Sequence, residues 1–251
     1  MRDPFKGMRF FIGLHQPSDA KNFAASFVSV NRLKARKGPF EVGDWIMDSG
    51  AFTIVNKHGG YPHPVSEYAA HIKRWAKNGN LLAAVAQDYM CEAFVLKKTG
   101  LTVADHHRLT IERYDELLKC DTGGVYVMPV LQGYAPSDYV QHIRLYGDRL
   151  KPGMWVGVGS VCKRNGDAQA IEAVLCAIKA ERQDLRLHGF GLKTTALRSG
   201  LVRSCLESAD SMAWSFAARK QGRNANDWKE ARAFLGGINT MQYQLPLLTA
   251  Y

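Results

Sequence analysis

Polar residues that could do chemistry stand in this chain where apolar stretches stop. Asp48 ends the stretch 45–48, and Asp88 follows the stretch 81–86. A carboxylate at the end of a buried strand is poorly solvated, so it tends to be paired or chemically active. Two carboxylates that face one carbon suit displacement at a glycosidic centre, where one attacks and the other moves protons. The same position after an apolar stretch is taken by Gln132, Gly157 with Gly159, His188 and Asp210.

Some of these residues have the chemistry of a base pocket. A carboxylate and an amide together offer the hydrogen-bond acceptors and donors that the edge of a purine needs. Paired glycines let the backbone approach a bound base closely. Taken singly, each residue has an ordinary structural role as a helix cap, a turn former or a core side chain. Their recurrence favours a shared site, so we predict a base pocket formed by Asp88, Gln132, Gly157, Gly159, Phe52 and His188.

The elements that must position these residues alternate between strand and helix. This alternation predicts a parallel sheet with helices outside it. Apolar stretches of strand length lie at 8–13, 45–48, 81–86, 125–131, 154–160, 185–191 and 208–215. Segments with helical spacing lie at 18–33, 64–78, 102–120, 136–150, 167–182 and 194–207, and a loop of about a dozen residues is expected before Pro64.

We predict a single α/β domain over residues 1–251, a (β/α)8 barrel of the TIM type. An open doubly wound sheet is less favoured because no GxGxxG phosphate turn follows the first strand. The pattern contains seven strands, so the eighth is expected near 233–235, or the last unit is incomplete or irregular. In a parallel barrel the carboxyl ends of all strands meet at one mouth, which would bring the polar residues together.

The charge balance favours a polyanionic partner. The 33 Lys and Arg residues outnumber the 23 Asp and Glu residues, which gives a formal net charge of +10 and a pI near 9.4. Such a surplus attracts nucleic acid at long range. Basic residues after the later strands suit phosphate contacts around an extruded nucleotide, and we single out Lys163, Arg164, Lys193, Arg219 and Arg223.

Other features argue against several classes of protein. No apolar run is long enough for a membrane span, and residues 1–7 lack the apolar core of a secretion signal. The five cysteines are widely spaced and form no CxxC pair, which argues against a disulfide framework and a local zinc site. We expect a cytoplasmic protein with free thiols and no membrane partner.

Several motifs resemble those of the tRNA-guanine transglycosylases, over roughly residues 8–224. Asp48-Ser49-Gly50-Ala51-Phe52 is similar to the DSGGF signature of that family, and Val130-Leu131-Gln132-Gly133 is similar to its VQGG. Residues 156–161 resemble its GGLSVGE segment, and residues 188–191 fall where the family has its MGVG strand. Residues 208–214 stand at the position of its nucleophile strand.

The chain also departs from that pattern. It lacks the Cys/His zinc subdomain of the family and the DCVLPTR run in the region after Asp210, and it is much shorter than a tRNA enzyme. In these respects it resembles more closely the branch that inserts 7-deazaguanines into DNA, found in phages and bacterial islands. The resemblance implies that DNA and a free 7-deazaguanine base are the substrates, and that no metal or redox cofactor is needed.

The resemblance also implies roles for individual residues. Asp210 would form a covalent link to C1′ as guanine leaves, and Asp48 would act as general acid and base. Because the segment around Asp210 departs from the family, the two aspartates could exchange these roles. Base binding would fall to Asp88, Gln132, Gly157 and Gly159.

Other functions would use the same residues. One alternative is a tRNA-guanine transglycosylase, and a second is a nucleosidase or deoxyribosyltransferase on free nucleosides, which would need no basic rim. A third is a catalytically silent nucleic-acid-binding barrel, which would tolerate the loss of Asp210. The sequence leaves open a homodimer and partner proteins that open the DNA.

Overall fold

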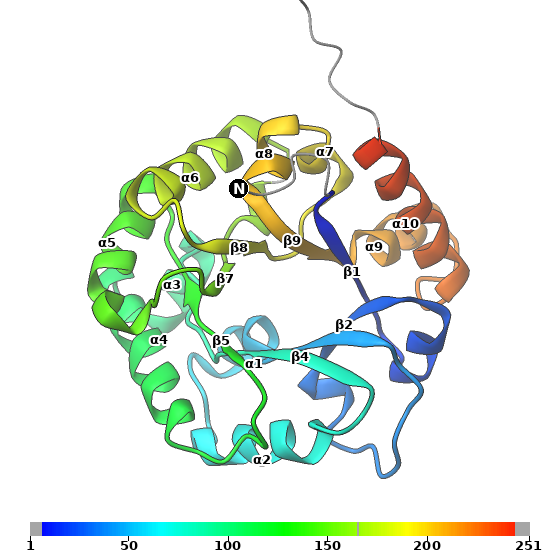
Figure 1. The fold of residues 1–251 in the computed structure, drawn as a ribbon, viewed down its shortest axis with the longest axis horizontal. Coiled ribbons are helices and arrows are strands. Elements are labelled where there is room, and N and C mark those ends of the chain that lie inside the picture. The colour runs from blue at the N-terminus through cyan, green and yellow to red at the C-terminus, as the bar shows by residue number, and fades with distance from the viewer. Residues whose placement is uncertain (1–6, 165, 244–251) are drawn as a thin grey trace, which may run out of the picture.

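The computed structural model describes residues 7–164 and 166–243, in which nine strands form a ring surrounded by helices (Figure 1). All paired strands are parallel, in the order β5-β4-β3-β2-β1-β9-β8-β7-β6. The predicted α/β fold of the TIM-barrel type is confirmed. The strands are β1 (Arg9–Gly13), β2 (Ala25–Ser29), β3 (Asp44–Asp48), β4 (Asn80–Val85), β5 (Val127–Met128), β6 (Val130–Leu131), β7 (Trp155–Val158), β8 (Arg186–Gly189) and β9 (Leu206–Ser211).

The barrel is nearly closed, and its seam lies at Pro129. β5 and β6 stand at the two ends of the strand order, yet only this proline separates them in the chain. β5 pairs with β4, and β6 pairs with β7. Proline has no backbone N–H to donate, but its carbonyl accepts a hydrogen bond of 2.8 Å from the Gly157 N–H. β5 and β6 therefore take the place of a single strand in an eight-stranded barrel.

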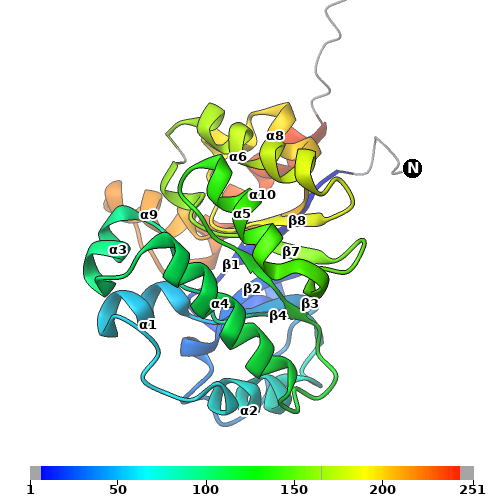
Figure 2. The same ribbon diagram turned by 90° about the vertical axis from the view of Figure 1, so that its left-hand side faces the viewer.

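Helices cover the outside of the ring (Figure 1). Figure 2 shows that α1, α3 and α9 lie together at one end of the barrel, and each follows the carboxyl end of a strand in the chain. Among the described residues no helix is long and apolar enough to cross a membrane. The helices are α1 (Ala51–His58), α2 (Val65–Trp75), α3 (Ala93–Thr99), α4 (Val103–Leu118), α5 (Pro136–Tyr146), α6 (Ala168–Glu181), α7 (Thr194–Leu197), α8 (Gly200–Cys205), α9 (Ala213–Lys220) and α10 (Trp228–Tyr243), with short 3-10 turns η1 (Pro17–Asn22), η2 (Val30–Arg32), η3 (Gly147–Arg149) and η4 (Cys162–Arg164).

The strands are buried on both faces, which explains their nearly continuous apolar sequence. In β3, Ile46 belongs to a cluster with Phe11 and Phe27 from neighbouring strands, whereas Trp45 and Met47 belong to the larger cluster that includes the helices. The first cluster fills the barrel and the second lies between the sheet and the helices. Because side chains alternate along a strand, Asp48 lies on the same inner face as Ile46.

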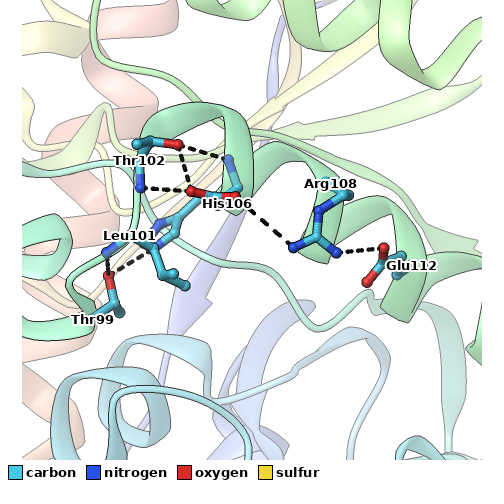
Figure 3. Close-up of polar contacts among 7 residues, drawn as sticks. Thr99, Leu101, Thr102, His106, Arg108 and Glu112 are labelled. Atoms are coloured by element: carbon cyan, nitrogen blue, oxygen red, sulfur yellow. Dashed lines mark hydrogen bonds and ion pairs between the residues drawn. The ribbon is translucent and has the colours of Figure 1, made fainter.

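Local contacts fix the entry to α4 (Figure 3). The Asp105 N–H donates to Thr102 Oγ1 at 3.2 Å, and the Thr102 N–H donates to Asp105 Oδ2 at 3.1 Å, and the two bonds form a capping box. The next residue, His106, is buried, with Nε2 2.9 Å from Thr99 Oγ1 and Nδ1 2.7 Å from the Met90 carbonyl oxygen. His106 thus ties the end of α3 to the loop after β4.

The predicted helix at 18–33 is wrong, because this segment contains β2 between the turns η1 and η2. Phe23, Phe27 and Val30 have helical spacing, but a short apolar run is ambiguous between helix and strand. Pairing with both β1 and β3 decides in favour of the strand. Phe27 then points into the barrel, and Val28 points toward the helices. This is the strand that was missing from the expected eight.

The structure also corrects the predicted bounds of several strands, helices and loops. Residues 233–235 lie inside α10 and form no strand, and α1 occupies part of the loop expected before Pro64. The expected strand 208–215 ends at Ser211 and is followed by α9. The expected helix 194–207 is divided into α7 and α8, with Ser199 capping the second helix through a bond from the Val202 N–H.

Candidate active site

Carboxylates from several strands meet at the mouth of the barrel. Asp48 ends β3 beside Ser29 of β2, and Asp210 in β9 lies beside Phe11 of β1. Asp88 follows β4. A cavity of about 150 Å³ opens at this mouth. Its lining is Asp48, Ala51, Phe52, Val85, Asp88, Met90, Glu92, Gln132, Gly159, Ser160, Cys162, Phe190 and Gly191.

Asp48 is placed to exchange a proton near neutral pH. Loss of hydration, together with the negative charge of Asp210, raises its pKa to about 6. Hydrogen bonds from the Ser29 side chain and the Gly50 backbone act in the opposite direction. Gly50 has φ of 73°, a left-handed conformation that glycine adopts without a steric penalty. A carboxyl group with this pKa can serve as both a general acid and a general base.

Asp88 and Gln132 form the base-reading half of the cavity in our prediction, and the structure brings them into contact. Gln132 Nε2 donates a hydrogen bond to Asp88 Oδ2. Ser160 Oγ donates to Gln132 Oε1 at 2.7 Å and accepts from the Cys91 N–H at 3.0 Å. This series of hydrogen bonds fixes which end of the Gln132 amide faces Asp88. Burial, together with the charges of Asp48 and Glu92, raises the pKa of Asp88 to about 7.

The two predicted glycines make room for neighbouring side chains. A Cβ atom on Gly159 would lie 2.1 Å from Gln132 Nε2, so only glycine permits the observed position of that amide. A Cβ atom on Gly157 would lie 2.4 Å from the ring of Phe190. The Gly159 carbonyl also accepts a hydrogen bond of 2.7 Å from Tyr139. Gly159 lines the cavity, and Gly157 lies against Phe190.

Asp210 is held by one of its two carboxyl oxygens. Oδ1 accepts a hydrogen bond of 3.1 Å from the Gly191 N–H and lies 3.3 Å from His188 Nε2. His188 Nδ1 lies 2.8 Å from Ser208 Oγ, to which the Trp155 indole N–H donates at 2.9 Å. An indole can only donate, so Ser208 is free to give its proton to Nδ1. With a neutral imidazole, Nε2 then carries the proton and donates to Asp210.

His188 lies beneath the site, with none of its surface exposed. Its ring stacks on Phe27, with centroids 5.6 Å apart and planes 13° apart. It therefore contacts Asp210 from the barrel interior. Phe52 lines the cavity at its outer edge and is 43% exposed.

The predicted basic residues have different surroundings. Arg164 donates to the Tyr134 carbonyl and lies 4.7 Å from the centre of the Tyr134 ring. Lys193 Nζ lies 5.8 Å from the centre of the Phe216 ring. Arg223 makes two bonds, of 2.6 and 2.9 Å, to Glu230. The side chain of Lys163 lies outside the described part of the structure.

Arg219 was predicted from the sequence, but it belongs to a basic group whose other members, His15 and Arg32, were not. Arg32 Nη2 donates to His15 Nδ1 at 3.3 Å, and His15 Nε2 lies 2.7 Å from Ser215 Oγ. Burial lowers the pKa of His15, and the positive charges of Arg32 and Arg219 lower it further. Within the described chain, neither arginine has a carboxylate partner. Because His15, Arg32 and Ser215 follow β1, β2 and β9, the group stands at the same mouth as Asp48 and Asp210.

Other contributing residues also carried no sequence signal of their own. Ser29, Ser160, Ser208 and Trp155 are common residue types whose role depends on what they contact. Among residues 7–164 and 166–243, no group of three or more His, Cys, Asp or Glu side chains could hold a metal ion.

Comparison with known proteins identifies the family of the chain. No curated protein matches it. The family model for DpdA, DeoxyPurine in DNA protein A, matches residues 7–229, which include β1 through α9 and every residue of the site described above. The chain therefore belongs to the DpdA family.

Proposed function

We propose that this protein is a transglycosylase that exchanges guanine in DNA for a free 7-deazaguanine base through a covalent aspartyl intermediate. The observation that carries the proposal is the arrangement of Asp48, Asp88 and Asp210 around one mouth, with Gln132 bonded to Asp88. The family supports DNA as the substrate, because its name describes a deoxypurine in DNA.

Asp210 is the proposed nucleophile. Its Oδ1 faces two N–H donors, so Oδ2 is the oxygen left to attack C1′ of the target nucleotide. As the bond from Oδ2 to C1′ forms, the bond from C1′ to N9 breaks and its electron pair leaves with guanine. Asp48 supplies the proton that neutralises the departing base. The result is a deoxyribosyl ester of Asp210 and free guanine.

The second half of the reaction reverses these steps with a different base. The incoming 7-deazaguanine gives its N9 proton to the Asp48 carboxylate and attacks C1′, and the ester oxygen of Asp210 leaves. Two successive inversions at C1′ retain the original configuration. Asp48 returns to its protonated state, so the protons balance over the cycle. A pKa of about 6 suits a group that must both give and take a proton.

Asp88 and Gln132 are the proposed readers of the base. Gln132 has a second N–H beyond the one bonded to Asp88, and Asp88 has a second carboxyl oxygen. With a pKa of about 7, Asp88 can accept a hydrogen bond when ionised and donate one when protonated. Phe52 and Gly159 would flank the base in the cavity.

His188 is better placed to support Asp210 than to touch the base. It is completely buried below the cavity, and its Nε2 faces Asp210 Oδ1. A donor at this oxygen stabilises the carboxylate and fixes its orientation. We propose that His188 is a positioning residue for the nucleophile.

The basic group around His15 supports a polyanionic substrate. Arg32 and Arg219 lack carboxylate partners within the described residues, whereas Arg223 is paired with Glu230. Unpaired arginines beside the catalytic pair suit phosphates of the substrate strand. The predicted residues Arg164 and Lys193, and Lys163 on η4, would extend this contact.

The test is incorporation of a radiolabelled base into nucleic acid. We expect label from guanine or a 7-deazaguanine to enter DNA with the unaltered protein, and to be lost in Asp210→Asn and in Asp48→Asn. Denaturing mass spectrometry should show a deoxyribosyl adduct that Asp210→Asn cannot form. Label in tRNA alone would move the substrate to RNA, and exchange on free deoxyguanosine alone would indicate a nucleoside enzyme. DNA binding without label in any substrate would contradict the proposal.

A further inference from the structure

Exposed aromatic side chains gather at the mouth of the barrel. Phe52 and Phe94 are each 43% exposed, Phe216 is 50% exposed and Tyr134 is 58% exposed. Phe52 lies in α1 after β3, and Phe94 lies in α3 after β4. Tyr134 follows β6, and Phe216 lies in α9 after β9. We call these four residues the aromatic rim. Exposed apolar groups that collect on one face usually mark a binding surface.

Phe52 and Phe94 connect the rim to the cavity. Their ring centroids are 6.2 Å apart, with the planes at 66°. Phe52 also lines the cavity beside Asp48 and Asp88. The helix that carries Phe94 is held at its end by the contact between Thr99 and His106 (Figure 3). A ring on an anchored helix loses little conformational entropy when a ligand stacks on it.

The other two rim residues lie beside cations. The Arg164 guanidinium lies 4.7 Å from the centre of the Tyr134 ring. Lys220 Nζ and Lys193 Nζ lie 4.9 and 5.8 Å from the centre of the Phe216 ring. An aromatic face next to a positive charge offers one surface for a base and another for its phosphate.

We propose that the aromatic rim stacks unpaired bases next to the target nucleotide, so that the protein binds a single-stranded or locally opened DNA strand. The identity of the target rests on the function proposed above. A base can reach the buried carboxylates only after it leaves the helical stack, and its neighbours then lose a stacking partner. Aromatic side chains replace that partner for any base, because every base has a flat face. An intact duplex shows phosphates at its surface and hides these faces.

The test compares binding of one sequence in two forms. A fluorescein-labelled oligonucleotide is titrated with protein as a single strand and as a duplex, at one fixed salt concentration. The variant Phe94→Ala/Tyr134→Ala/Phe216→Ala leaves Phe52 in the cavity. We expect it to bind the single strand at least about tenfold more weakly and the duplex within about twofold of the unaltered protein.

The control removes exposed apolar side chains from the other face. Leu118 at the end of α4 and Leu145 near the end of α5 are 53% and 48% exposed. Helices run back along the barrel, so these residues lie away from the mouth. Leu118→Ala/Leu145→Ala should bind both DNA forms within about twofold of the unaltered protein. If the triple variant fails to fold by circular dichroism, Phe94→Leu and Phe216→Leu test the same expectation, since leucine keeps the apolar area without the flat ring.

The outcomes separate this inference from the proposed reaction. An unchanged affinity for the single strand, or an equal loss for both DNA forms, would contradict the proposed stacking role of the aromatic rim. This holds even if base exchange is observed. A selective loss of single-strand affinity would support it even if the protein exchanges no base. Where exchange does occur, the variant should raise the KM for DNA and leave the KM for the free base unchanged.

Discussion

The two halves of the site have similar hydrogen-bond chains but different electrostatic surroundings. In the half around Asp88, a serine hydroxyl orients an amide, and the amide donates to the carboxyl group. In the half around Asp210, a serine hydroxyl lies against an imidazole, and the imidazole faces the carboxyl group. Each half is a buried hydrogen-bond chain that ends at a carboxyl group.

The difference lies in what faces that carboxyl group. Burial and two neighbouring carboxylates raise the pKa of Asp88 to about 7, so it can take or give a hydrogen bond. The Asp210 oxygen Oδ1 instead has a backbone N–H and an imidazole nitrogen beside it, and these two contacts fix the orientation of the carboxyl group. The comparison predicts that changes in the first half act on base binding, and changes in the second act on the chemical step.

The largest expected effect is the loss of the proposed nucleophile, Asp210. Asp210→Asn keeps the shape of the side chain and removes its negative charge. We expect base exchange to fall by roughly 10⁴-fold or more, because an amide cannot replace the carboxylate that forms the ester in the proposed reaction. Retained label in DNA is the measurement, and binding of the free base serves as the control. A loss below about tenfold would move the nucleophile to another residue.

Substitution of His188 should have the next largest effect on the rate of base exchange. His188→Leu should lower kcat by about 10²-fold and leave the KM for the free base unchanged, because only a donor to Asp210 is lost. His188→Gln, which can still present an N–H, should recover part of the rate. If instead the KM for the base rises and kcat is kept, His188 belongs to the base pocket, as the sequence alone suggested.

Substitution of Gln132 tests the half of the site around Asp88. Gln132→Ala should raise the KM for the free base by about 10- to 100-fold, since it removes one reader and leaves buried Asp88 without its donor. Ser160→Ala removes only the hydrogen bond that orients the Gln132 amide. It should therefore raise the KM for the free base by a smaller factor. Steady-state kinetics at saturating DNA measures both. An effect on kcat alone would contradict the division between the halves.

Asp88 should make stability fall with rising pH. Its folded-state pKa of about 7 lies above the ordinary 3.8, so the folded protein holds a proton that the unfolded chain has lost between these values. The cost of ionising Asp88 therefore appears as the pH rises above 3.8, and it is fully present above about 7. Asp88→Asn removes this cost, on the order of 4 kcal/mol when fully present. The Tm advantage of the variant should be larger at pH 8 than at pH 5, and equal differences would argue against a buried ionisation.

The smallest effect is expected from Ser29. Its side-chain hydrogen bond lowers the pKa of Asp48, so Ser29→Ala should move that pKa upward from about 6. The corresponding limb of the kcat/KM profile against pH should shift upward by less than about one unit. Ser26→Ala, on the same strand, is the control, although Ser26 is fully buried and Ser29 is half-buried. A downward shift would mean that another group controls the profile.

Much of the architecture could be predicted because it depends on local patterns. Each of the seven predicted strand segments overlaps an observed strand, and these segments and the helices around α2, α4, α5 and α6 follow from short-range apolar spacing. The failure at β2 has a physical reason. Five residues carry too little periodicity to separate strand from helix, and pairing with β1 and β3 made the choice.

The sequence by itself determined which polar residues stand at strand ends, and on which face of the sheet they lie. Side-chain alternation places Asp48 on the face of Ile46, and the common direction of parallel strands brings the ends to one mouth. Tertiary structure alone decided their partners. Gln132 meets Asp88 across 44 residues, His188 lies under Asp210, and Arg32 meets His15. Such pairs depend on strand order and register, which are set by the packing of the whole barrel and leave no mark on the spacing of any one segment.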